Sequence, residues 1–137
     1  MNAQSLLPRL DADNRPFFQA AAEGRLEIQY CSDCSAPRFY PRLLCPECHS
    51  DRSQWRESKG AGTLYSFAVV RRAPTPSFAD RVPYVVALID LDEGVRVFAN
   101  VFADPDQMQI DQRVRVQIKK VSDEVGIPEF VIERGED

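Results

Sequence analysis

The sequence has no long apolar run, and its charge balance is acidic, not basic. The 137 residues carry a formal net charge of −4. No stretch approaches the roughly 18 apolar residues of a membrane helix, and the start, MNAQSLLPRLDADNRP, has no basic region followed by an apolar run. We therefore expect no signal peptide, no membrane partner and a cytoplasmic location.

Catalytic motifs are also missing. There is no G-x-S-x-G serine, no P-loop and no G-x-G-x-x-G after a strand, and the only histidine, His49, directly follows a cysteine. Asp90, Asp92 and Glu93 lie close together in the sequence, but such clusters are typical of hairpin turns. We expect no catalytic residue here, and so a chain that is not an enzyme on its own.

Charge is distributed unevenly along the chain. Residues 36–81 contain eight Lys or Arg and four Asp or Glu, whereas residues 82–137 contain six and twelve. The acidic second half argues against a surface for long nucleic acids, which is usually strongly basic. The basic middle leaves open a small phosphorylated ligand, an acidic partner or a solvated arginine-rich face.

The four cysteines form two C-x2-C pairs separated by ten residues. In a reducing compartment this spacing predicts metal ligands before disulfides. Four thiolates suit tetrahedral Zn²⁺ and leave no open position for substrate, so the site is predicted to be structural. Iron, as in a rubredoxin, is the alternative. The predicted ligands are Cys31, Cys34, Cys45 and Cys48.

A short helix is predicted between Asn14 and Gly24, with Asp13 or Asn14 as its N-terminal cap and the glycine at its end. Phe17 and Phe18 belong to its apolar stripe. The stripe packs either on the protein's own body or on a partner, and the sequence leaves both open.

After the helix we expect a mainly β chain in three parts: an N-terminal helical segment at 1–25, a zinc ribbon at 26–58 and a barrel at 59–137. The joint at 59–62 is glycine-rich and is expected to be flexible. The ribbon is predicted to have strands at 26–30 and 55–57, with a strand and its return between the cysteine pairs at 37–44. The barrel strands are predicted at 63–70, 84–91, 95–102, 113–121 and 129–133, with a loop or helical turn at 103–109. Five strands with a longer connection before the fourth match an OB-fold barrel, and an SH3-like barrel is the main alternative.

Several motifs together resemble one known family. They are Pro16-Phe17-Phe18, Glu23-Gly24-Arg25-Leu26, the cysteine pairs with Pro37-Arg38-Phe39-Tyr40-Pro41-Arg42 between them, Trp55, Gly60-x-Gly62, Tyr65-Ser66-Phe67-Ala68-Val69-Val70 and Pro83-Tyr84-Val85-Val86-Ala87. The chain resembles acyl-CoA-associated OB-fold proteins with an N-terminal rubredoxin-like zinc ribbon. This resemblance covers residues 16–121.

The resemblance implies a companion subunit of thiolase-like enzymes of lipid metabolism. Such proteins assemble with acyltransferases, ketothiolases or sterol side-chain aldolases, whose own Cys and His do the chemistry. The small subunit adds rigidity and, in some complexes, part of the channel for coenzyme A. The family often has glycine after each cysteine pair, where this chain has Ser35 and His49, which we expect to tolerate positive φ. It also tends to have an Ile-Gly turn, where this chain has Ile110 and Asp111.

Two sets of residues are candidates for binding. The loop at 71–81 joins the first two barrel strands, a common ligand site of OB folds. We expect the partner or the coenzyme A channel to meet this loop and the helix at Phe17, Phe18, Arg71, Arg72, Phe78 and Arg81. The aromatics Tyr65, Phe67, Tyr84 and Phe98 form either barrel core or a stacking surface for bases. A nucleic-acid-binding zinc-ribbon and OB module is therefore one alternative function. A rubredoxin-like electron carrier is the other.

Overall fold

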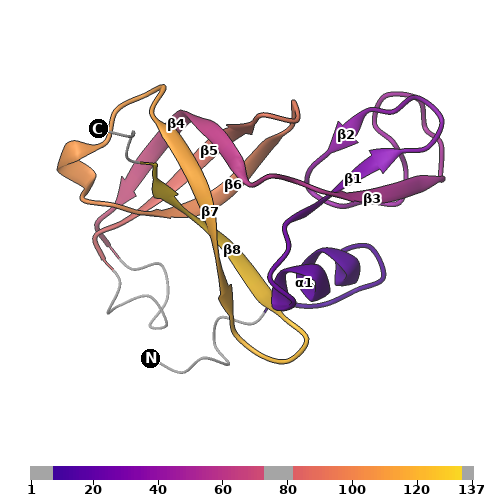
Figure 1. Cartoon of the computed structure of the whole chain (residues 1–137), viewed down its shortest axis with the longest axis horizontal. Coiled ribbons are helices and arrows are strands. Elements are labelled where there is room, and N and C mark those ends of the chain that lie inside the picture. Colours follow the sequence, from indigo (N-terminus) through magenta and orange to yellow (C-terminus); the bar gives the residue numbers. More distant parts are fainter. Residues whose placement is uncertain (1–7, 73–81, 134–137) are drawn as a thin grey trace.

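The structure, a computed structural model, describes residues 8–72 and 82–133. One helix, α1 (Arg15–Ala22), precedes a small ribbon and a barrel (Figure 1). The ribbon strands are β1 (Glu27–Cys31), β2 (Pro37–Arg38) and β3 (Ser53–Glu57). The barrel contains β4 (Ala61–Val70), β5 (Tyr84–Leu91), β6 (Arg96–Phe102), β7 (Arg113–Lys120) and β8 (Gly126–Ile132), with the 3₁₀ turn η3 (Pro105–Gln107) before β7. In these ranges no helix is long and apolar enough to cross a membrane.

Helix α1 begins and ends near its predicted limits, but its start is capped differently. Asn14 occupies the N-cap position, yet its side chain makes no hydrogen bond to the helix. Instead its amide donates to the carbonyl of Arg9 and to the hydroxyl of Tyr40, at 3.0 and 2.9 Å. The predicted N-cap position is therefore confirmed for Asn14, but its side chain is used elsewhere than in a capping hydrogen bond. The buried Asn14 ties the helix to the ribbon.

The C-terminal end of α1 follows the prediction. Gly24 has φ +90°, and its N–H donates to Ala21. The N–H of Arg25 donates back to Ala20. This pair of bonds is the Schellman motif, in which a residue of positive φ lets the chain satisfy the last carbonyls of the helix.

The ribbon sheet has the order β2-β1-β3, with antiparallel pairing throughout. In the segment at 37–44, predicted as a strand and its return, the strand comprises Pro37 and Arg38, which pair with β1. The chain after β2 turns away, and the buried Arg38 guanidinium donates to the carbonyls of Arg42 and Leu43. The Arg38 side chain therefore holds the return segment in place.

The barrel closes in the order β4-β5-β6-β8-β7. Strands β6 and β8 run parallel, and every other neighbouring pair is antiparallel. This is the predicted OB topology and not that of an SH3-like barrel. Strand β8 begins three residues before the predicted start, because Pro128 lies inside it, and proline counts against a strand in a sequence-based prediction.

A β-bulge in β4 changes the face of the strand to which its aromatic side chains point. Leu64 pairs with Ile89 and Ser66 with Leu88, so Tyr65 is the extra residue. Tyr65 faces outward beside the buried Leu64, and the extra residue turns Phe67 back against the core. Two residues apart in a regular strand, Tyr65 and Phe67 would share one face, and the bulge separates them.

The glycine-rich joint before the barrel is held by hydrogen bonds. The carboxylate of Glu93, at the β5–β6 turn, accepts from the hydroxyl of Ser58 and the N–H of Lys59, both at 2.9 Å. Strand β4 already begins at Ala61, and the carbonyl of Gly60 accepts from Val116. The prediction of a flexible joint is therefore wrong.

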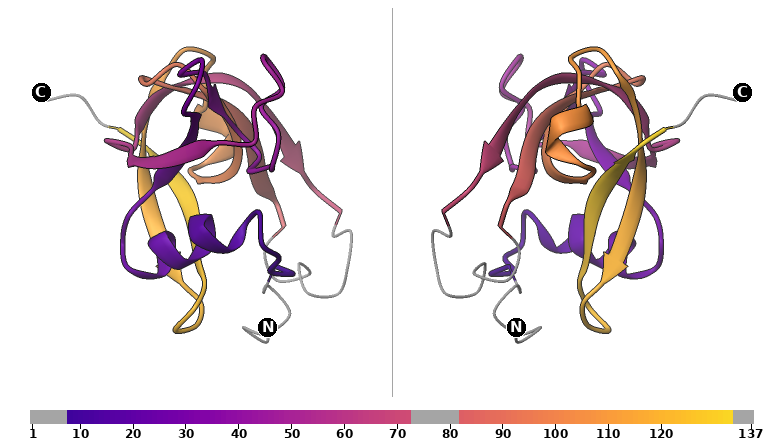
Figure 2. Two further views of the ribbon diagram at one scale, coloured as in Figure 1. Left: turned by 90° about the vertical axis from the view of Figure 1, so that its right-hand side faces the viewer. Right: turned by 90° about the vertical axis from the view of Figure 1, so that its left-hand side faces the viewer.

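Helix α1 and the barrel share one core. The helix lies against the β7–β8 hairpin (Figures 1 and 2), and Phe17 and Phe18 join the same buried cluster as barrel residues such as Phe130. The contact is closest at Gly126, where an added Cβ would collide with the backbone of Ala21. The apolar stripe of the helix therefore packs on the protein's own body.

Replacement of Gly126 by alanine tests this contact. We expect it to lower the free energy of unfolding by roughly 3 kcal/mol, because the helix backbone must move away from β8. Gly94→Ala is the matched control, since Gly94 has φ +99° with open space around it, and costs only about 1 kcal/mol. Chemical denaturation measures both. Equal losses in the two variants would contradict the close contact.

Candidate functional site

The two cysteine pairs form two matching turns of backbone. In the first, Ser35 has φ +68° and donates from its N–H to the carbonyl of Cys31; in the second, His49 has φ +67° and donates likewise to Cys45. Both residues occupy the left-handed region that glycine favours. The expectation of positive φ after each pair is therefore confirmed. His49 is exposed and serves the turn through its backbone.

The turns bring the four cysteine sulfurs together. All of them lie within 4.8 Å of one another, with Cys31 3.5 Å from Cys48 and Cys34 3.7 Å from Cys45. Zinc–sulfur bonds of about 2.3 Å in a tetrahedron separate the sulfurs by about 3.8 Å, so the spacing fits one metal ion. A disulfide needs about 2.05 Å, and all four thiols are free.

Backbone donors prepare the sulfurs for a cation. The N–H of Cys34, together with that of Asp33, donates to the Cys31 sulfur and lowers the pKa of this thiol to about 6. At Cys48 the N–H of Ser50 favours the thiolate, but the neighbouring Cys31 sulfur and burial outweigh it and raise the pKa to about 12. Four thiolates at these distances repel one another, so the centre holds four charged sulfurs only around a cation.

Hydrogen bonds of the Asp33 carboxylate, beside the sulfur cluster, join the two cysteine turns. The carboxylate of Asp33 accepts from the hydroxyl of Ser50 and from the guanidinium of Arg52. These donors hold the pKa of Asp33 below its usual range. Asp33 belongs to the first turn and Ser50 follows the second, so the contact fixes their relative position.

Each of the three carboxylates at the β5–β6 hairpin forms an ion pair or accepts hydrogen bonds. Asp90 pairs with Arg96 at 2.6 Å, and Asp92 pairs with Arg113 at 2.7 Å. Each partner lowers the pKa of its carboxyl group. With Glu93 bound to the joint, the cluster has a structural role in the turn, as predicted.

The turn before β7 keeps the shape that a glycine would give it. Asp111 has φ +74°, and its N–H donates to the carbonyl of Leu64 at 2.8 Å. Leu64 in turn donates to Gln112 at 2.8 Å. Asp111 therefore adopts, at the position where the family tends to have glycine, the positive φ that glycine favours.

The residues predicted to meet a partner are not brought together as one surface. Phe17 and Phe18 are buried in α1, whereas Arg71 and Arg72 are exposed just beyond the end of β4. Phe78 and Arg81 lie outside the described residues. Contact of this set with a partner remains a prediction.

The four candidate stacking aromatics are split between core and surface. Phe67 and Tyr84 are half-buried, while Tyr65 and Phe98 are exposed. The guanidinium of Arg96 lies over the Tyr65 ring, 3.5 Å from its centroid, and covers this face. Phe98 is exposed on the outer face of β6.

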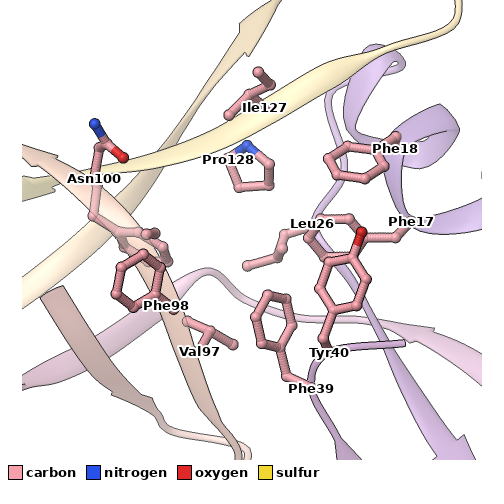
Figure 3. A pocket seen from close by; sticks show the side chains of 12 residues that line it. Phe17, Phe18, Leu26, Phe39, Tyr40, Val97, Phe98, Asn100, Ile127 and Pro128 are labelled. Carbon is pink, nitrogen blue, oxygen red and sulfur yellow. The ribbon is translucent and has the colours of Figure 1, made fainter. Parts of the chain in front are cut away.

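An apolar pocket of about 410 Å³ opens beside Phe98 (Figure 3). It lies where the barrel, α1 and the ribbon loop meet. Its lining is apolar and aromatic apart from Asn100 and the Tyr40 hydroxyl, and no lining side chain is charged. The lining residues are Phe17 and Phe18 of α1, Leu26, Phe39 and Tyr40 of the ribbon part, residues 97–100 of β6, and Ile127, Pro128 and Phe130 of β8.

Most of this pocket was not predicted, although one signal was available. In β6 the residues that alternate outward are Arg96, Phe98, Asn100 and Phe102, and two of them are aromatic. Aromatics at solvent-facing positions indicate a binding surface. The contribution of Tyr40 gave no such signal, because it depends on the hydrogen bond from Asn14.

Two family models match the chain. Residues 18–53 match the rubredoxin-like zinc ribbon domain of ChsH2, and residues 55–119 match its C-terminal OB-fold domain. A solved chain described as "Ltp2-ChsH2(DUF35) aldolase" has 35% identity and a TM-score of 0.82, and the match covers 92% of this chain and 98% of that one.

Curated relatives agree with these matches. A "DUF35 domain-containing scaffold protein" of Methanothermobacter thermautotrophicus is 37% identical, over 69% of this chain and 71% of that protein. A "Benzoylsuccinyl-CoA thiolase subunit BbsA" of Thauera aromatica is 28% identical, over 77% and 74%. A "Probable enoyl-CoA hydratase alpha subunit" of Thermomonospora curvata is 36% identical over 90% of this chain, which spans only 38% of that relative's length. The ribbon, the barrel and these matches together show that the chain belongs to the ChsH2/DUF35 family of zinc-ribbon and OB-fold scaffold proteins.

Proposed function

We propose that the chain is a noncatalytic subunit that assembles with a thiolase-fold enzyme acting on acyl-CoA, which is an acyltransferase, a ketothiolase or a side-chain aldolase. The observation that carries this proposal is the match at 35% identity, over nearly the whole of both chains, to a chain of an aldolase complex. The thiolase subunit of Thauera aromatica supports the same class of partner. We also propose that the complex is cytoplasmic, as expected from the sequence.

The side-chain chemistry supports a structural role. The four cysteines form one cluster, and the carboxylates of the β5–β6 hairpin are held by Arg96, Arg113 and the joint. Among the described residues, the hydroxyls reported to donate to carboxylates, Ser50 to Asp33 and Ser58 to Glu93, hold the cysteine turns and the joint together. The hydratase activity named for a longer relative is not carried over, because most of that protein has no counterpart here.

The metal in this proposal is zinc, held by Cys31, Cys34, Cys45 and Cys48. The closed shell of four sulfurs gives it no catalytic position. Bound zinc stabilises the ribbon, which is too small to fold through apolar burial alone. A stable ribbon in turn fixes the loop that contains Tyr40 beside the barrel.

The exposed arginines at the end of β4 are proposed to lie beside the coenzyme A entrance of the complex. Arg71 and Arg72 are exposed. Guanidinium groups bind phosphates well, and coenzyme A carries several. The two arginines would act together with Phe78 and Arg81 of the same loop.

Metal analysis tests the zinc proposal. We expect one zinc ion per chain, a colourless protein, and loss of both zinc and the thermal transition of the ribbon in Cys45→Ser. His49→Gly is the control, because His49 contributes only backbone conformation, and it retains zinc. A coloured protein that contains iron would contradict the assignment.

Co-purification from the native host at low salt tests the partner. We expect a thiolase-fold subunit to accompany the chain in a fixed ratio, identified by mass spectrometry. A chain that purifies alone, or with nucleic acid that dissociates steeply as salt rises, would overturn the proposal and favour a free binding module.

The double variant Arg71→Ala/Arg72→Ala tests whether these arginines bind coenzyme A at its entrance to the complex. We expect coenzyme A to bind the assembled complex about tenfold more weakly, because two phosphate contacts are lost. Arg115→Ala, an exposed arginine on β7, is the control and leaves the affinity unchanged. Unchanged affinity in the double variant, measured by calorimetry, would exclude this site.

A further inference from the structure

The barrel has an open seam between β6 and β8. The two strands pair only at Val101 with Phe130 and at Phe102 with Val131. Before this point they diverge, although β6 still pairs with β5 on its other side. Among the described residues no strand pairs with the seam side of residues 96–100. Alternate residues there present backbone N–H and C=O groups without a ladder partner.

The two edges of the seam differ. Strand β8 contains Pro128, which has no N–H to donate and disfavours pairing with an added strand. Strand β6 has no proline, and its one charged residue in this stretch, Arg96, pairs with Asp90 and lies over Tyr65. The β6 edge is therefore the one open to another strand.

The apolar pocket lies directly at this edge. Residues 97–100 of β6 form one wall, and Tyr40 with Phe39 lies opposite (Figure 3). The rim is exposed: 57% of Phe98 and 41% of Tyr40 are accessible to solvent. Exposed aromatics around an apolar pocket are typical of protein-binding sites, where a buried anchor is surrounded by a contact rim.

The occupant of the seam must satisfy backbone groups as well as fill the pocket. An acyl chain provides no hydrogen bonds for a strand edge, and the lining has no cation for the phosphates of coenzyme A. An extended polypeptide supplies both kinds of contact, because its backbone pairs with the edge while alternate side chains point to one side.

We propose that an extended segment of the partner enzyme adds to the free edge of β6 and inserts a bulky apolar side chain into the pocket between β6, β8, α1 and the Phe39–Tyr40 loop. This inference rests on the proposed function, which supplies the partner. Five free residues of β6 accommodate a segment of about 17 Å. The segment ends before Phe102, because β8 already occupies the edge there.

Because the free edge of β6 ends before Phe102, Phe98 and Phe102 can be compared as a matched pair of variants. Phe98 and Phe102 lie on the same strand, are both exposed, and point outward, but only Phe98 lines the pocket. Phe98→Glu places a charge at the pocket mouth, and Phe102→Glu places the same charge beyond the open edge. Circular dichroism and zinc content verify that both variants are folded.

The experiment measures binding of each variant to the purified partner subunit by calorimetry. We expect Phe98→Glu to weaken binding about 30-fold or more, as for an interface hot spot, and Phe102→Glu to change it less than about threefold. A photoreactive benzoylphenylalanine at position 98 should also crosslink to an apolar segment of the partner.

Each other outcome overturns the inference. If wild type binds the partner and both variants bind equally, the seam is not the docking site, although the proposed function stands. If the chain alone forms a dimer that Phe98→Glu dissociates, a second copy occupies the seam. If no thiolase-fold partner binds wild type at all, the proposed function and this inference fail together.

Discussion

The close contact of α1 with strand β8 is the constraint on which the rest of the arrangement depends. The absence of a side chain at Gly126 lets the helix backbone lie directly on the barrel, and this brings Phe17 and Phe18 into the barrel core. The helix also carries Asn14, whose amide holds the Tyr40 hydroxyl. One backbone contact therefore fixes the helix and, through it, the ribbon loop beside the open seam.

The metal centre and the barrel have separate tasks in this arrangement. The four cysteines organise a ribbon whose strands are too short to be stable alone. Arg38, only 4% of which is exposed, holds the loop that follows through the carbonyls of Arg42 and Leu43. A buried cation bound to carbonyl oxygens makes this loop rigid. The ribbon part thus contributes Phe39 and Tyr40 as one wall of the pocket.

The two proposed binding regions occupy different parts of one barrel. The arginines at the end of β4 are charged and exposed, which suits phosphates, whereas the seam at β6 is apolar and has a free strand edge, which suits a polypeptide. The proposed function requires both properties, because in it the chain binds a partner enzyme and contributes to a polar path for coenzyme A. The separation of these chemistries allows each to be tested without disturbing the other.

The sequence by itself determined the features that depend on local spacing. The cysteine pairs, the positive φ at Ser35 and His49, the glycine at the end of α1 and the five barrel strands all follow from residue type and periodicity. Tertiary structure decided the bulge at Tyr65, the hydrogen-bonded joint, the role of Asn14 and the open seam. The first three depend on a contact with a distant residue. Leu88 pairs across the bulge, Glu93 accepts hydrogen bonds from the joint, and Tyr40 accepts from Asn14. Such pairings are set by packing between segments far apart in the chain, which a local pattern does not encode.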